Sequence, residues 1–214
     1  MAIIEELKQA ISVAEICGGT RRAVLPNILY DCVKPNARGG NTYIFFQTKV
    51  GERILGTADE MKTHVHTNLE TPSRLPKGET FDIIGCFMAI APLIYRDADG
   101  AGLAYLQYIM KGSVEIIFGT NSYRIIPVPL LLHSEIKITI GAGSGDSALT
   151  MNYYSMQPPM LLDKGYFTFS EVKRIEEDMT FNVKYELVET LPDNNNPFYV
   201  YFGFVGYHTK YIGA

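Results

Sequence analysis

The spacing of apolar residues divides the chain into a short helical start and a longer body of strands. An amphipathic helix is predicted over residues 1–17, because apolar side chains recur there at spacings of three and four: Ile3, Leu7, Ala10, Ile11 and Ala14. Two glycines at 18–19 are typical of a helix end. Residues 20–40 contain two prolines and a Gly-Gly pair, so an extended arm is predicted there rather than packed structure.

From residue 42 onward the period of the pattern changes from 3.6 to 2. Residues 180–189 alternate cleanly, with Phe181, Val183, Tyr185 and Leu187 on one face. Residues 198–212 are apolar on both faces, so this strand is either central in a packed sheet or covered by another chain. The segments predicted as strands are 42–50, 53–58, 79–95 (with a bulge at Gly85), 104–112, 113–121, 122–130, 134–141, 148–156, 166–172, 180–189 and 198–212. Two hairpins are predicted among them, one of 42–50 with 53–58 and one with its turn at residues 119–122.

Strands in this number, joined by short turns and some polar loops, exclude a parallel α/β sheet because the crossover helices that it needs are missing. The predicted fold is therefore all-β: an antiparallel β-sandwich, a single jelly roll, with a short N-terminal helix and an extended arm. The predicted domains are 1–40 for the helix and arm and 41–214 for the sandwich.

Composition and charge narrow the function classes. The net charge of −4 and the isoelectric point near 5.6 give no general attraction to nucleic acid or anionic lipid. The N-terminus lacks the features of a secretion signal, and the apolar runs are too short to cross a bilayer. Three cysteines, Cys17, Cys32 and Cys86, match no zinc or disulfide framework and are expected to be free thiols.

One spacing suggests a metal site. His64, His66 and Glu70 form H-x-H-x-x-x-E, the spacing by which cupin enzymes hold a metal, and alternate residues of a strand point to the same side. However, Pro72 and Pro76 follow where a regular strand is required, and no second motif is present around His133. Loop histidines are favoured, and a cupin-like metal-dependent enzyme using His64, His66 and Glu70 is kept as the alternative.

The other chemical motifs are fragments. Residues 141–147 (GAGSGDS) resemble a phosphate loop but lack a following helix, and Asp97 and Asp99 are only part of a calcium loop. A basic arm, with Arg21, Arg22, Lys34 and Arg38, could neutralise phosphates, although a solvated linker is favoured. No catalytic, cofactor-binding or metal-binding residue is therefore predicted.

Two stretches, NLETPSRLPKGETFDIIGCFMAI (68–90) and LLDKGYFTFSEVKRIEEDMTFNVKYELVE (161–189), resemble segments of the jelly-roll capsid proteins of tailless icosahedral bacteriophages. The final FYVYFGFVGYHTKYIGA is similar to the last strand of such proteins. The resemblance covers a third to a half of the chain. It implies a non-catalytic coat subunit that self-assembles around a genome, with one jelly roll at this length.

That resemblance sets the expectations for partners and location. We expect a homo-oligomer formed through apolar faces and the N-terminal helix and arm, located in the virion and made in the host cytoplasm. Contacts with other virion proteins are compatible with this, and contact of the 21–38 arm with nucleic acid stays open. No cofactor is expected. A third hypothesis is a carbohydrate- or ligand-binding sandwich that uses exposed tyrosines of NYY (152–154) or of the C-terminal run.

Overall fold

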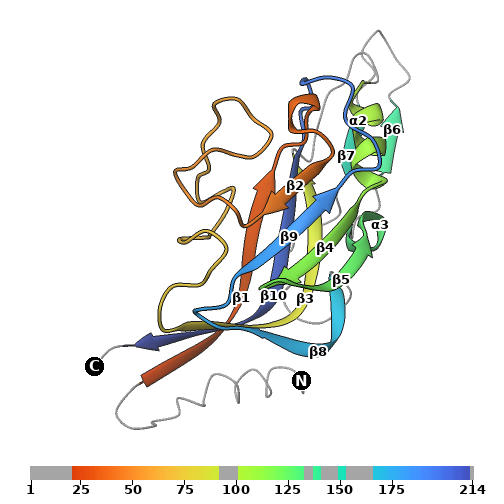
Figure 1. Cartoon of the computed structure of the whole chain (residues 1–214). Coiled ribbons are helices and arrows are strands. Elements are labelled where there is room, and N and C mark those ends of the chain that lie inside the picture. Colours follow the sequence, from red (N-terminus) through yellow and green to blue (C-terminus); the bar gives the residue numbers. More distant parts are fainter. Residues whose placement is uncertain (1–20, 92–100, 133–136, 141–148, 153–165, 213–214) are drawn as a thin grey trace.

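Two four-stranded antiparallel sheets pack against each other (Figure 1). The computed structural model describes residues 21–91, 101–132, 137–140, 149–152 and 166–212. The first sheet has the order β1 (Arg21–Val33), β10 (Tyr199–Ile212), β3 (Glu79–Ala91), β8 (Phe167–Ile175). The second has the order β2 (Thr42–Phe45), β9 (Phe181–Glu186), β4 (Ser113–Phe118), β5 (Asn121–Pro127). The predicted all-β antiparallel sandwich is confirmed at this level.

Smaller elements connect these strands. A 3-10 helix, η1, covers Ala37–Gly39, and two α-helices cover Ala101–Met110 (α2) and Val128–Leu131 (α3). Strands β6 (Lys137–Ile140) and β7 (Leu149–Asn152) pair only with each other. Among the described residues, no helix has the length and apolar character needed to cross a membrane.

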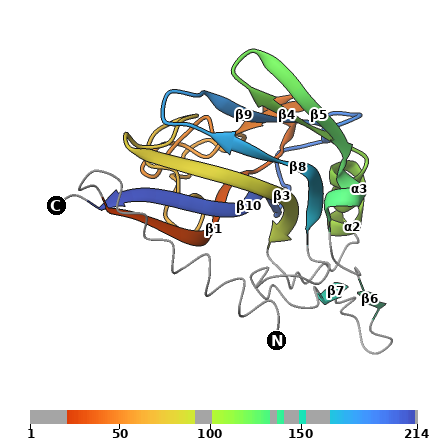
Figure 2. The ribbon, with the colours of Figure 1, turned by 90° about the horizontal axis from the view of Figure 1, so that it is seen from below.

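The strand pairs of the two sheets are nested. β1 pairs with β10, β2 with β9, β3 with β8 and β4 with β5, all antiparallel. Successive pairs in this series fall alternately in the first and the second sheet. Two further pairings, β10 with β3 and β9 with β4, complete the sheets. The chain therefore follows the path of one long two-stranded ribbon rolled into two layers. Figure 2 shows these layers from below.

Phenylalanine rings fill the space between the sheets. Phe45, Phe46 and Phe202 are fully buried, as is Phe204. The Phe46 ring lies 5.5 Å from the Phe204 ring and the Phe45 ring 5.7 Å from the Phe202 ring, measured between centroids. Offset and edge-to-face pairs at these distances add to the free energy gained from apolar burial. Phe202 and Phe204 of β10 thus contribute directly to the packing of the two sheets.

Several predicted strands are present. The alternation in 180–189 is confirmed, because Phe181, Val183, Tyr185 and Leu187 are buried. Strands β4 and β5 form the predicted hairpin across Gly119. The bulge near Gly85 is also confirmed, since the pairing of β3 with β10 passes from Gly85 to Ile83 and skips one residue.

The doubly apolar strand 198–212 is β10, and it is central in the first sheet, between β1 and β3. Its apolar character on both faces is explained in part by this position, since Phe202 and Phe204 enter the core and Val205 is only 7% exposed on the other face. Covering by another chain is therefore not required to account for this run.

The arm predicted over 20–40 differs from the structure. Arg21–Val33 is β1, paired with β10 along its whole length, with Leu29, Cys32 and Val33 buried. The sandwich therefore begins by Arg21 rather than at residue 41. Pro26, read as a break, is tolerated because β1 is an edge strand and needs hydrogen bonds on one side only. The predicted helix over 1–17 lies outside the described residues.

Two strand predictions were wrong. The segment 104–112, read as a strand, is helical as far as Met110, where α2 ends, and Tyr105, Leu106 and Ile109 form one buried face of that helix. The hairpin predicted over 42–58 is absent, because β2 ends at Phe45 and pairs with β9.

A buried ion pair fixes the chain after β2. Lys62 and Asp31 are both fully buried, and Lys62 Nζ donates to Asp31 Oδ1 and to the Thr48 carbonyl (3.1 Å). The second Asp31 oxygen accepts the Phe46 backbone N–H at 2.6 Å. Phe46 has a φ of +67°, which a non-glycine residue adopts only when its surroundings hold it there. Asp31 therefore determines both the turn after β2 and the position of the loop over residues 46–78.

We predict that Lys62→Ala lowers the free energy of unfolding by about 3–5 kcal/mol, because it leaves the Asp31 carboxylate buried without its cation. Urea denaturation followed by circular dichroism measures the loss. Lys77→Ala is the matched control, since Lys77 is exposed and has no side-chain partner among the described residues. Equal stability of the two variants would show that the pair does not anchor the loop.

Candidate functional site

The three residues of the predicted cupin spacing lie in the loop over 46–78, outside the sandwich. His64 and Glu70 are exposed, and none of the three lies in a strand. His66 is half-buried: its Nδ1 accepts the Thr63 N–H at 3.1 Å, and its ring centroid lies 5.6 Å from that of Tyr199. Burial lowers the pKa of His66, against the opposing charge of Glu60.

This arrangement does not support the cupin alternative. A cupin holds its metal inside the barrel, whereas the space between these sheets is filled by phenylalanine rings. No group of three or more His, Cys, Asp or Glu side chains could hold a metal ion within the part of the chain that the structure describes. H-x-H places two imidazoles on one side only where the backbone is extended, and residues 64–66 do not lie in a strand.

Other sequence candidates lie outside the described residues. They are Cys17, Asp97 and Asp99, residues 141–147, His133, and Tyr153 and Tyr154.

The two described cysteines are buried thiols. Cys32 on β1 and Cys86 on β3 are free and fully buried. Burial raises the pKa of each thiol to about 12. A thiol with such a pKa is almost entirely protonated at neutral pH, and the thiolate is the nucleophile. Neither cysteine is suited to nucleophilic catalysis.

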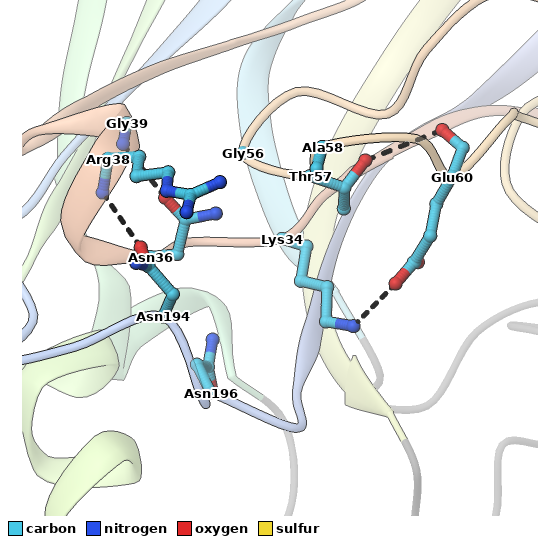
Figure 3. Close-up of a pocket in the computed structure, with 10 residues that line it drawn as sticks. All are labelled: Lys34, Asn36, Arg38, Gly39, Gly56, Thr57, Ala58, Glu60, Asn194 and Asn196. Atoms are coloured by element: carbon cyan, nitrogen blue, oxygen red, sulfur yellow. Dashed lines mark hydrogen bonds and ion pairs between the residues drawn. The ribbon is translucent and has the colours of Figure 1, made fainter.

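The structure instead forms a polar pocket of about 310 Å³ at one end of the sandwich (Figure 3). Three segments far apart in sequence build it: the turn after β1 with η1, the loop around Gly56, and the loop before β10. The lining residues are Lys34, Asn36, Arg38, Gly39, Gly56, Thr57, Ala58, Glu60, Asn194 and Asn196.

One wall of the pocket is a satisfied ion pair. Lys34 Nζ lies 2.8 Å from Glu60 Oε1 and 4.7 Å from the centroid of the Tyr199 ring, and the Tyr199 hydroxyl donates to the other Glu60 oxygen. Burial acts to raise the pKa of Glu60, but the hydrogen bonds from Lys34 and Tyr199 outweigh it, so the pKa lies below its ordinary value. Glu60 is therefore an anion whose charge is already balanced.

The opposite wall presents hydrogen-bond donors. Asn36 Oδ1 accepts the Gly39 N–H (2.8 Å), and Asn194 Oδ1 accepts the Arg38 N–H (3.1 Å), which leaves both amide Nδ2 groups without a partner among the described residues. The Arg38 guanidinium likewise has no partner there. Asn196 differs, because its amide donates to the Pro35 and Phe198 carbonyls.

The backbone around the pocket is closely fitted. The Lys34 N–H donates to the Leu55 carbonyl at 2.9 Å. Gly56 has a φ of +94°, and a Cβ built there would lie 1.8 Å from the Lys34 carbonyl oxygen, so only glycine fits at this contact. The loop carrying Glu60 is therefore held at a fixed distance from β1.

Sequence reasoning identified only part of this site. Lys34 and Arg38 were expected to belong to a solvated basic arm. The structure pairs Lys34 with Glu60 and places Arg38 at the pocket. The asparagines and Gly56 gave no sequence signal, because isolated Asn and Gly residues in loops are common.

The loop over 46–78 also covers the free edge of β1. Asn68 Oδ1 accepts the Tyr30 N–H (2.9 Å), and Asn68 Nδ2 donates to the Ile28 carbonyl (2.6 Å). Thr67 Oγ1 donates to the Tyr30 carbonyl at 3.0 Å. At residues 28–30, backbone groups of β1 that could pair with a strand of another molecule are thus occupied.

Comparisons with known proteins give no relative from which to transfer a function: no family model, no curated protein and no solved structure matches the chain.

We predict that Cys32 and Cys86 do not react with a thiol reagent in the folded protein and react fully in denaturant, because both are buried and protonated. The measurement uses a Cys17→Ser variant and a chromogenic disulfide reagent at pH 8. Rapid labelling of either thiol without denaturant would contradict the burial described for β1 and β3.

Proposed function

We propose that the chain is a structural virion protein, a non-catalytic capsid subunit whose sandwich is a single jelly roll. The observation that carries the proposal is the nested pairing of β1 with β10, β2 with β9, β3 with β8 and β4 with β5. A ribbon rolled so that successive pairs alternate between two sheets is the topology of a jelly roll. Eight-stranded jelly rolls are used by viral capsid proteins, lectins and cupins.

The core favours a structural role among these uses. Cupins need an open interior, whereas Phe46, Phe181 and Phe204 occupy the space here with centroid distances of 5.2–6.4 Å. Because the interior of this sandwich is filled, binding and assembly involve its surfaces and loops. The resemblance of residues 68–90 and 161–189 to bacteriophage capsid segments supports the same choice.

The four sheet edges differ in a way that suits directed self-association. The edge of β1 is capped at residues 28–30 by Thr67 and Asn68. At the other end of each sheet, β5 and β8 have no further strand beside them among the described residues. Ile125 on β5 is 65% exposed and Val172 on β8 is 64% exposed. We propose that a second copy of the chain packs on this side, because unpaired strand edges with apolar side chains are sites of association.

We predict that the purified protein forms large oligomers or particles at neutral pH, seen by light scattering coupled to size exclusion and by negative-stain electron microscopy. The double variant Ile125→Asp/Val172→Asp is expected to shift the population towards monomer at least tenfold, because it places two carboxylates in an apolar contact.

Val65→Asp is the control for this experiment. Val65 is 72% exposed but lies in the loop over 46–78, away from β5 and β8. It is expected to assemble like the unchanged protein. A protein that stays monomeric at every concentration and salt condition would overturn the proposed function. Assembly that is equally sensitive to both substitutions would overturn only the proposed surface.

A further inference from the structure

We propose that the polar pocket between η1 and the loops around Gly56 and Asn194 is a binding site for a small oxyanion, with Arg38 as its main ligand. The proposal is independent of the jelly-roll assignment and of self-assembly, since it rests on the donors that line one cavity. Neither the nested fold nor the capsid role requires a small-molecule site.

The side chains on one wall of the cavity offer more hydrogen-bond donors than acceptors. The Arg38 guanidinium and the Nδ2 groups of Asn36 and Asn194 have no partner among the described residues, and all three residues line the cavity. Asn36 is only 8% exposed as a residue, and its Nδ2 is not among the buried polar atoms without a partner, so this amide is open to water or to a ligand at the cavity. The three side-chain groups on this wall that lack a protein partner are all donors, so a ligand that binds them must supply acceptors.

The charged residues that line the cavity favour an anionic ligand. Two cations, Lys34 and Arg38, and one carboxylate, Glu60, line the cavity. Glu60 is bound by Lys34 and by the Tyr199 hydroxyl, so its negative charge is neutralised on its own wall. The nearby Asp193 carboxylate points elsewhere, accepting the Tyr105 hydroxyl at 2.6 Å and the Asn195 N–H at 2.8 Å. The Arg38 charge therefore remains uncompensated, and the cavity favours an anion.

The shape of the Arg38 guanidinium and the size of the cavity both match a small oxyanion. A guanidinium presents its N–H groups as a planar fork that matches two oxygens of a carboxylate or a phosphate. Figure 3 shows the Arg38 and Asn36 side chains together on one side of the cavity, with Lys34 and Glu60 on the other. The cavity volume of about 310 Å³ lies at the lower end of the range for small-molecule sites. It suits inorganic phosphate or a short dicarboxylate.

Preorganisation strengthens the assignment. Asn36 and Asn194 are each fixed through Oδ1 by a backbone N–H, so their free Nδ2 groups are held in place before any ligand binds. Asn196 ties the loop before β10 to the Pro35 carbonyl at 2.7 Å, directly below the same wall. Little ordering of these two amides would therefore be needed on binding, whereas the exposed Arg38 side chain becomes ordered only with the ligand.

The test titrates the full chain with inorganic phosphate and with succinate, following the melting temperature and calorimetric heat, with sodium chloride at matched ionic strength as the reference. Binding by the unchanged protein is expected to weaken at least about tenfold in Arg38→Gln, since a charge-assisted bidentate contact is lost. Asn194→Asp keeps the Oδ1 acceptor for the Arg38 N–H but removes the donor and adds a negative charge, so it is expected to weaken binding as strongly.

Arg74→Gln is the control, because Arg74 is exposed, lies outside the cavity and has no side-chain partner among the described residues. It should bind as the unchanged protein does. A response to phosphate alone would identify a tetrahedral oxyanion, and a response to both probes would identify oxyanions in general. No response of the unchanged protein beyond that to chloride would overturn the proposal. Equal responses in all four proteins would overturn it as well.

Discussion

A fully buried ion pair between Asp31 on β1 and Lys62 in the following loop is the contact on which the shape of this end of the molecule depends. Two charges removed from water are tolerated only when each satisfies the other, so breaking either partner would strand a buried charge. The pair therefore obliges the loop over 46–78 to stay against β1. Asp31 also holds the Phe46 N–H, and through it the turn that ends β2.

Three surface features follow from that one constraint. The anchored loop places Thr67 and Asn68 against residues 28–30 of β1, where they occupy backbone groups of the strand edge. The same loop carries Glu60 to Lys34 and forms one wall of the polar pocket. It also holds His66 against Tyr199 on the outside of the sandwich. The loop over 46–78 thus covers part of one sheet edge, that of β1, and forms one wall of the polar pocket.

The sequence pattern predicted those strands in which buried and more exposed residues alternate regularly. Phe181, Val183 and Tyr185 alternate with polar residues because β9 has one face in the core. The pattern failed where burial is uneven. Tyr105, Leu106 and Ile109 fit either a strand or one face of a helix, and packing against the sandwich selects the helix. Pro26 suggested an irregular arm, but an edge strand tolerates proline.

The pocket and the ion pair could not be predicted in the same way. Asp31 and Lys62 are 31 positions apart, and Asn36 and Asn196 are brought together only by the rolled path of the chain. Local spacing carries no information about such contacts. The H-x-H spacing at His64 depends on a strand for its meaning, and the loop position favoured from Pro72 and Pro76 is the one that the structure has.

Hydrogen exchange of two backbone amides reports whether the Asp31–Lys62 ion pair holds the loop over 46–78 against β1. The Tyr30 N–H is bound by Asn68 and the Phe46 N–H by Asp31, so both depend on the anchored loop. If the ion pair holds the loop as described, both amides exchange only through global unfolding, as slowly as the Val183 amide in β9. Exchange of Tyr30 and Phe46 at the rate of exposed loop amides, while Val183 stays protected, would contradict the account.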